Sequence, residues 1–286
     1  MRELRFTVTE SEDGLSAAAF LRQHGFSQRM ISSLKYSGGI TRGGEVLRGV
    51  DIVRFGDNVR VVMKDSVGTD PNAPNPNVKA RLVYEDDDAA VFDKPPEVPV
   101  HPSYGHRNDT LANLFAALYP DRPFRAINRL DKNTTGLCVC AKNRLAASLL
   151  SGNVSKVYYA VVDGDISEPG EISAPIARVS DSIILREVRD AALGGKPAVT
   201  RYKPILRKNG RTLLEINLLT GRTHQIRVHF SYIGFPLCGD SMYGGDCSAI
   251  SRQALHCGEI RFAQCVTGEQ ICLKSPLPED MVTLLK

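Results

Sequence analysis

The sequence predicts an α+β protein with a mixed, largely antiparallel sheet, flanking helices and a small N-terminal α/β domain. A length of 286 residues favours two domains. Strand-like and helix-like segments do not alternate strictly, which disfavours a doubly wound parallel sheet. Residues 65–80 hold three prolines, three asparagines and almost no apolar side chains, so they cannot build a core. We therefore expect a first domain over residues 1–64, a linker over 65–80 and a second domain over 81–286.

The first domain is predicted to contain two short helices followed by a small sheet. Residues 14–25 favour a helix closed by Gly25, because glycine readily ends helices. Ser27 is a suitable N-cap for a second helix with apolar side chains on one face. Residues 39–63 are expected to form two or three short strands joined by glycine turns. The apolar face of the second helix consists of Met30, Ile31 and Leu34.

The first domain is also basic. Residues 1–64 carry ten Lys and Arg against seven Asp and Glu, so they supply three charges of the net +4. Arg22, Arg29 and Lys35 fall on the predicted helices, which suits binding to an RNA backbone. A basic face exposed to solvent has the same composition, and charge alone does not separate the two interpretations.

The second domain is predicted to begin with a hairpin whose turn is the acidic run Glu85 to Asp88. We interpret this run as a solvated turn between two apolar strands. The residues that follow predict alternating stretches of strand and helix, with Thr110 and Asn143 as helix N-caps. The predicted helices cover 110–118, 143–150 and 223–233, and the predicted strands cover 137–141, 156–163 and 213–219.

The sequence lacks the motifs of phosphate-cradling loops, of the GxSxG nucleophile elbow and of zinc sites. There is no GxxxxGK[ST], no GxGxxG after a strand and no GxSxG in the sequence. The seven cysteines include no CxxC, and His224 and His229 are five residues apart, which separates them on a helix. We therefore expect no metal site. No apolar run has the length of a membrane span, and the charged first ten residues lack the apolar core of a secretion signal, so we expect a cytoplasmic protein.

One loop concentrates groups that can do chemistry. In NRLDKNTTG, residues 128–136, Asp131 stands between Arg129 and Lys132 and directly precedes an apolar strand. Such a carboxylate can act as a nucleophile or a general base, although a solvated turn capped by an Asp has the same pattern. A second basic cluster, LLTGRTHQIRVH, lies at a predicted strand-to-helix turn and supplies Arg222 and Arg227.

The order of these motifs resembles the RluA-type pseudouridine synthase family. RLDKNTTGLCVCAK is similar to the family signature RLDxxTSGLL, and further family motifs follow over nearly all of residues 82–286. The first domain is similar to the S4 RNA-binding domain, through Ser27, Ile31, Gly39-Ile40 and residues 56–59. The other motifs of the second domain are Lys94-Pro95 with His101-Pro102, KVYYA (156–160), GKPAVT (195–200), LTGRTHQIRVH (219–229), Gly239-Asp240 with Tyr243-Gly244, and Ala254-Leu255-His256.

The resemblance implies the pseudouridine synthase fold and the isomerisation of uridine to pseudouridine in RNA without a cofactor. Asp131 matches the catalytic aspartate, and either attack on the sugar C1′ or proton abstraction at C2′ is open to it. Tyr158 matches the aromatic residue that packs against the target base. Arg227 matches the basic partner of the aspartate, with Arg222 as the other candidate. Arg129 would hold the acid and receive phosphate.

The resemblance also implies a substrate and leaves alternatives. The S4-like domain indicates large-subunit ribosomal RNA, transfer RNA being the alternative, and we expect a monomer. A non-catalytic RNA-binding protein of this fold is another alternative. A glycoside hydrolase would instead pair Asp131 with an acid of the run Glu85 to Asp88.

The chain departs from the family pattern at three positions. Asn128 stands where His is usual, Glu97 replaces a glycine, and Thr135 replaces Ser. We expect the first to alter how the target base leaves its stack.

Overall fold

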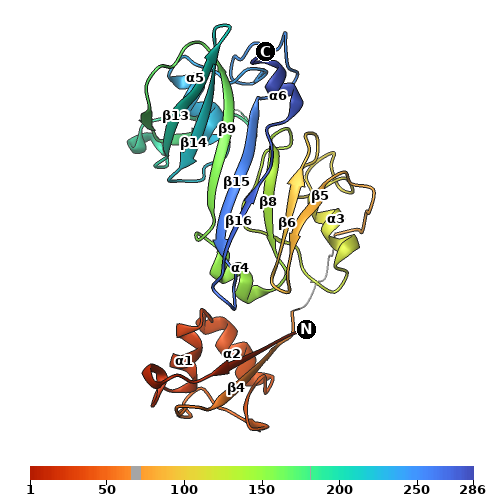
Figure 1. The fold of residues 1–286 in the computed structure, drawn as a ribbon, viewed down its shortest axis with the longest axis vertical. Helices are drawn as coiled ribbons and strands as arrows, with labels where there is room; N and C mark the ends of the chain where they lie inside the picture. Colours follow the sequence, from red (N-terminus) through yellow and green to blue (C-terminus); the bar gives the residue numbers. More distant parts are fainter. Residues whose placement is uncertain (66–71, 181) are drawn as a thin grey trace.

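The computed structural model describes residues 1–65, 72–180 and 182–286. The chain forms two units, a small one at the N-terminus and a larger one built on a long sheet (Figure 1). Of the predicted linker, residues 66–71 lie outside the described residues. The part of the linker that follows is attached to the larger unit, because the Asn75 backbone N–H donates to the Asn113 carbonyl at 3.0 Å.

The N-terminal unit has a four-stranded antiparallel sheet in the order β1-β4-β2-β3. Two helices cover it and enclose a core of their own, which includes Phe20, Met30 and Val59. Ser27 caps the second helix as predicted, since its hydroxyl accepts from the Met30 N–H. The elements are β1 (Arg2–Thr7), α1 (Ala17–Gln23), α2 (Gln28–Tyr36), β2 (Ile40–Arg42), β3 (Glu45–Val46) and β4 (Asn58–Met63), with a short 3-10 turn at Glu10–Glu12.

Within the described residues, the larger unit contains a ten-stranded sheet. The pair β8–β15 is parallel and the other pairs are antiparallel, so the expected mixed, largely antiparallel sheet is confirmed. Its main path runs β10-β13-β14-β9-β15-β8-β6-β5, with β16 beside β15 and β7 beside β8. The strands are β5 (Arg81–Glu85), β6 (Ala89–Lys94), β7 (Arg125–Ala126), β8 (Thr135–Ala141), β9 (Ser155–Asp163), β10 (Gly170–Ser173), β13 (Val199–Lys208), β14 (Arg211–Leu218), β15 (Leu255–Ala263) and β16 (Gln270–Lys274). A separate pair consists of β11 (Ile176–Arg178) and β12 (Arg186–Val188).

The helices of the larger unit lie close to where the sequence predicts them. Thr110 forms a capping box with Asn113, and the Asn143 side chain accepts from the Ala146 N–H, so both predicted N-caps are confirmed. The helices are α3 (Leu111–Leu118), α4 (Arg144–Leu150), α5 (Gln225–Tyr232) and α6 (Glu279–Thr283), with a 3-10 turn at Ala191–Leu193. None of the helices in residues 1–65, 72–180 and 182–286 is long and apolar enough to cross a membrane.

Strand β8 is buried along its whole length and fixes the loop in front of it. Gly136 has φ +104°, and a Cβ there would collide with the backbone of Cys257 on β15. Glycine is therefore required at the point where the two parallel strands meet, and the loop that ends in TTG enters the sheet at a fixed place.

The acidic run Glu85 to Asp88 forms the expected turn, and Glu85 and Asp87 are exposed as predicted, but the prediction of a solvated side chain is wrong for Asp88. Asp88 is only 2% exposed and accepts hydrogen bonds from Arg2 and Asn143. Asp86 accepts from the Ala89 N–H and from the Tyr84 hydroxyl. Glu85 and Asp87 accept from Lys142 and Arg2 as well, so all four acids are hydrogen-bond acceptors, which their local sequence does not reveal.

Candidate active site

The loop 128–134, which precedes β8, places Asp131 in contact with α5, which follows β14. The Nη1 of Arg227 donates to Asp131 Oδ2 at 3.0 Å. The same guanidinium donates from Nε and Nη2 to both carboxylate oxygens of Asp240, at 2.7 and 2.8 Å. Asp240 is 1% exposed, so this bidentate pair fixes the arginine and leaves one edge of it for Asp131.

The charges around Arg227 also determine its ionisation. Burial alone lowers the pKa of Arg227, but the hydrogen bonds and charges of Asp240 and Asp131 outweigh burial and raise the pKa above its ordinary value. Arg227 is therefore a permanent cation. Arg222 is exposed and its Nε donates to the Pro197 carbonyl at 3.0 Å, so it is not the partner of Asp131.

His224 lies beside Asp131. The sequence predicted no role for this residue beyond its place in a motif. Its Nε2 lies 3.7 Å from Asp131 Oδ2, and its Nδ1 lies 2.8 Å from the Tyr243 hydroxyl. That hydroxyl accepts from the Arg186 N–H and can donate to Nδ1, which places the ring proton on Nε2, facing Asp131. Burial lowers the pKa of His224, which favours this neutral tautomer.

His224 also occupies an uncommon backbone conformation. Its φ is +56°, in the left-handed region that non-glycine residues rarely adopt. The residue stands at the N-cap of α5, where the turn from β14 must reverse into the helix. Strain of this kind occurs at functional sites, where the surrounding contacts hold it.

Lys94, at the end of β6, contacts the loop 128–134 that carries Asp131. It is 1% exposed, and its Nζ donates to the carbonyls of Pro95 and Lys132 at 2.9 Å each. Burial lowers the pKa of Lys94 to about 7, while the charge of Asp131 opposes that shift. The sequence contributed Lys94 only as part of a motif, and its contact with the loop depends on the fold.

Asn128 lies at the cleft wall, and its side-chain amide is engaged by β8. Its side chain is 7% exposed, donates to the Leu137 carbonyl at 3.0 Å and accepts from the Val139 N–H at 2.8 Å. The amide is thus held by β8 through both its donor and its acceptor, and the expected effect of Asn128 on how the target base leaves its stack stays a prediction. Thr135, which stands where the family usually has Ser, also has a structural contact, since its hydroxyl lies 2.9 Å from His256 Nδ1.

The loop opens into a cleft of about 1050 Å³. Its described walls are the 99–106 loop, residues 126–132, the start of β9 and the turn after β14. Asp131 is the one carboxylate among these described lining residues, and five cations accompany it. They are Arg129, Lys132, Lys156, Arg186 and Arg222. A polyanion can enter this cleft and meet a single acid.

Two other sets of predicted residues lie outside the cleft. Arg22, Arg29 and Lys35 are exposed on α1 and α2 of the N-terminal unit. The acids of the run Glu85 to Asp88, all of which the structure describes, do not line the cleft. The pair of facing carboxylates that a glycoside hydrolase needs is therefore absent from its described lining, and that alternative is wrong.

Comparison with known proteins decides the family. Residues 88–232 match the family model described as RNA pseudouridylate synthase. The chain is 37% identical to an uncharacterized RNA pseudouridine synthase of Bacillus subtilis, YjbO, over 92% of this chain and 95% of that protein. It is likewise 37% identical to the ribosomal large subunit pseudouridine synthase D of Pseudomonas aeruginosa, over 94% and 89%.

The chain belongs to the RNA pseudouridine synthase family. Among solved structures it is similar to human RNA pseudouridylate synthase domain containing 1, with 26% identity and a TM-score of 0.58. That match covers 70% of this chain and 84% of the human one. The enzyme is an isomerase that acts on RNA and converts uridine to pseudouridine.

Tyr158 has a place in this synthase that fits a contact with uracil. It lies on β9, is 6% exposed and lines the cleft together with Asp131. Burial raises the pKa of the phenol, so its hydroxyl stays protonated. In residues 1–65, 72–180 and 182–286, no group of three or more His, Cys, Asp or Glu is arranged to hold a metal ion. A cofactor-free reaction stays a prediction.

Proposed function

We propose that this synthase isomerises uridines of large-subunit ribosomal RNA, with Asp131 as the catalytic carboxylate. The observation that carries the proposal is the cleft itself, where Asp131 shares the lining with five cations and is held by Arg227. The cations bind the phosphates on either side of the target nucleotide, and the acid meets its sugar. The carboxylate and its arginine are already in contact, so little reorganisation is needed.

The reaction requires the target base to leave its stack, because its reacting atoms are otherwise covered. Tyr158 then packs against the displaced uracil. The N1–C1′ bond breaks, uracil turns, and a C5–C1′ bond forms. The hydrogen of C5 is released to solvent, and N1 acquires a proton, so no oxidant or reductant takes part. Asp131 begins the sequence by attack at C1′ or by removing the C2′ proton.

Ribosomal RNA is favoured over transfer RNA by the name of the Pseudomonas aeruginosa relative, which spans nearly the whole chain. The N-terminal unit, predicted to be S4-like, adds exposed cations in Arg22, Arg29 and Lys35. We propose a monomer that acts in the cytoplasm, where such RNA is assembled. A non-catalytic protein is disfavoured because Asp131, Tyr158 and Arg227 meet in one site.

The test is incubation of the purified protein with unmodified large-subunit ribosomal RNA and, separately, with unmodified transfer RNA. Pseudouridine is then mapped at single-nucleotide resolution. The proposal expects defined sites in the ribosomal RNA, and none with Asp131→Asn. Modification confined to transfer RNA would overturn the proposed substrate, and pseudouridine in neither RNA would overturn the activity.

A further inference from the structure

The two units are joined by a shared hydrophobic contact as well as by the chain. Leu145 of α4 is 3% exposed and belongs to the core of the N-terminal unit, and Leu149 packs against the same core. A Cβ at Gly25 would collide with the Leu149 side chain, so α1 ends directly against α4. An N-terminal unit that moved freely on its linker would leave this apolar surface in water.

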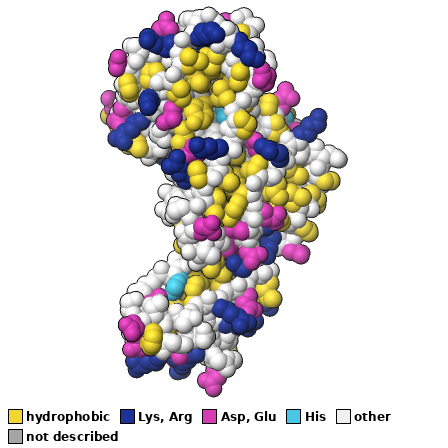
Figure 2. Space-filling model, viewed as in Figure 1, with side chains coloured by type: hydrophobic (Ala, Val, Ile, Leu, Met, Phe, Trp, Pro, Cys, Tyr) yellow, Lys and Arg dark blue, Asp and Glu magenta, His cyan; other side chains and the backbone are white. Residues whose placement is uncertain are grey.

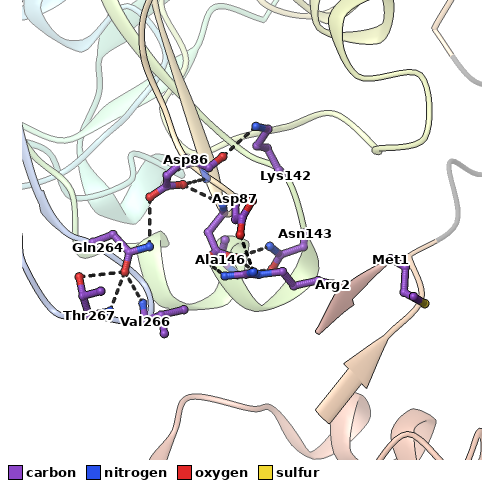
Figure 3. A network of polar contacts seen from close by, with 12 residues as sticks. Met1, Arg2, Asp86, Asp87, Lys142, Asn143, Ala146, Gln264, Val266 and Thr267 are labelled. Carbon is purple, nitrogen blue, oxygen red and sulfur yellow. Dashed lines mark hydrogen bonds and ion pairs between the residues drawn. The ribbon is translucent and has the colours of Figure 1, made fainter. Parts of the chain in front are cut away.

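Polar contacts surround this shared core. Arg2 of β1 donates from Nε and Nη2 to the two oxygens of Asp88, at 3.0 and 2.9 Å, and from Nη1 to Asp87 at 2.7 Å. Asp88 in turn accepts from Asn143, the N-cap of α4, at 2.7 Å. Figure 3 shows Arg2 extending from the N-terminal unit to Asp87, with Asn143 beside them. Asp and Glu side chains lie where the two units meet in Figure 2.

The connection between the units is also held on both sides of residues 66–71. The Asp65 side chain is 6% exposed and accepts from the backbone N–H and the Nε of Arg144, at 2.8 and 2.5 Å. Beyond the gap, the Asn113 side chain donates to the Ala73 carbonyl at 2.8 Å. These contacts attach the described ends of the linker to the larger unit.

The helix that receives the N-terminal unit leads directly into the cleft. After α4 ends at Leu150, the chain continues through Gly152, Val154, Ser155 and Lys156, which all line the cleft. The docked unit therefore stands at a fixed offset from the cleft wall, and hence from Asp131. Two RNA-binding surfaces at a fixed offset favour only those RNAs whose two contacts match that spacing.

We infer that Arg2, Asp88 and Leu149 are positioning residues that select which uridine reaches Asp131. They do so by fixing the N-terminal unit on α4. The inference rests on the proposed function and deepens it. The acidic run, which the local sequence predicts to be a solvated turn, is on this account part of the surface on which the N-terminal unit docks.

The test compares Arg2→Glu and, independently, Leu149→Glu with the wild-type full-length protein. Arg5→Glu is the matched control, since it makes the same charge change on β1 at an exposed side chain that contacts Glu3 of the same unit. Small-angle X-ray scattering reports docking through the maximum dimension of the particle. Mapping on ribosomal RNA reports selectivity as the ratio of pseudouridine at the preferred site to pseudouridine elsewhere.

Wild type and Arg5→Glu are expected to be compact and selective. Arg2→Glu and Leu149→Glu should extend the particle and lower selectivity about tenfold or more. Their turnover of a short single-stranded uridine oligomer should stay at the wild-type level. The double substitution Arg2→Glu with Asp87→Arg restores one ion pair and should recover part of both docking and selectivity.

An extended wild-type particle, or an extended Arg2→Glu or Leu149→Glu protein with unchanged selectivity, would overturn the inference while the proposed function stands. Absence of pseudouridine in the wild-type reaction would instead overturn the proposed function, whatever the scattering shows. Equal loss of selectivity in Arg5→Glu would overturn the inference as well, because charge rather than docking would then be responsible.

Discussion

Replacing Lys94 by methionine removes a buried ammonium group that contacts the loop carrying Asp131. Burial lowers the pKa of Lys94 from 10.5 to about 7. At 1.36 kcal/mol per pKa unit, this shift corresponds to about 5 kcal/mol by which burying the charged form destabilises the fold. This loss of unfolding free energy is fully present below the folded pKa, where Lys94 is protonated in both the folded and the unfolded state. It shrinks as pH rises from about 7 and is gone above the unfolded value of 10.5.

The assay is urea unfolding of both proteins at pH 7 and pH 9. Between these values the wild type should gain about 2 kcal/mol of unfolding free energy from Lys94 alone. Lys94→Met cannot show this gain, and other titrating groups cancel in the comparison. Its kcat should also fall, because the Lys132 carbonyl beside Asp131 loses its donor. Equal pH increments in the two proteins would refute the reasoning.

Predictions at three further positions follow from the geometry. Glu97→Gly should raise the unfolding free energy by roughly 0.5–1 kcal/mol in urea, because Glu97 is exposed at φ +67° and the relief of left-handed strain exceeds the added freedom of the unfolded chain; a loss of stability would contradict this. Tyr158→Phe should keep most of the pseudouridine-forming activity, whereas Tyr158→Ala should lose it and about 3–5 kcal/mol of stability. Equal activity loss in both would indicate a role for the hydroxyl. Arg222→Gln should weaken RNA binding in filter assays and reduce its salt slope by about one, with an unchanged single-turnover rate at saturating RNA; a large rate loss would place Arg222 in the chemistry.

Much of the secondary structure was predictable because its signals are local. Ser27, Thr110 and Asn143 each precede an apolar helical pattern and cap a helix in the structure. The order of the strands was not predictable in this way. The parallel pairing of β8 with β15 joins residues about 120 positions apart, and no local pattern encodes it.

The same distinction between local signals and long-range contacts applies to the candidate site. Asp131, Tyr158 and Arg227 were named through motifs. The structure places Asp131 and Tyr158 in the lining of one cleft and Arg227 in contact with Asp131. Their support depends on contacts between distant segments, such as Asp240 with Arg227 and Lys94 with the loop. The buried Asp88 was misread for the same reason, since its partner Arg2 is 86 positions away.

The most direct measurement of the central claim is tritium release from RNA labelled at uridine C5, with wild type and Asp131→Asn. The amide is nearly isosteric but is a poor nucleophile and base, so release should fall to background. The freed charge of Arg227 favours a polyanion, so RNA binding by the folded variant should hold or tighten. Release near the wild-type rate from folded Asp131→Asn would contradict the assignment of Asp131 as the catalytic carboxylate.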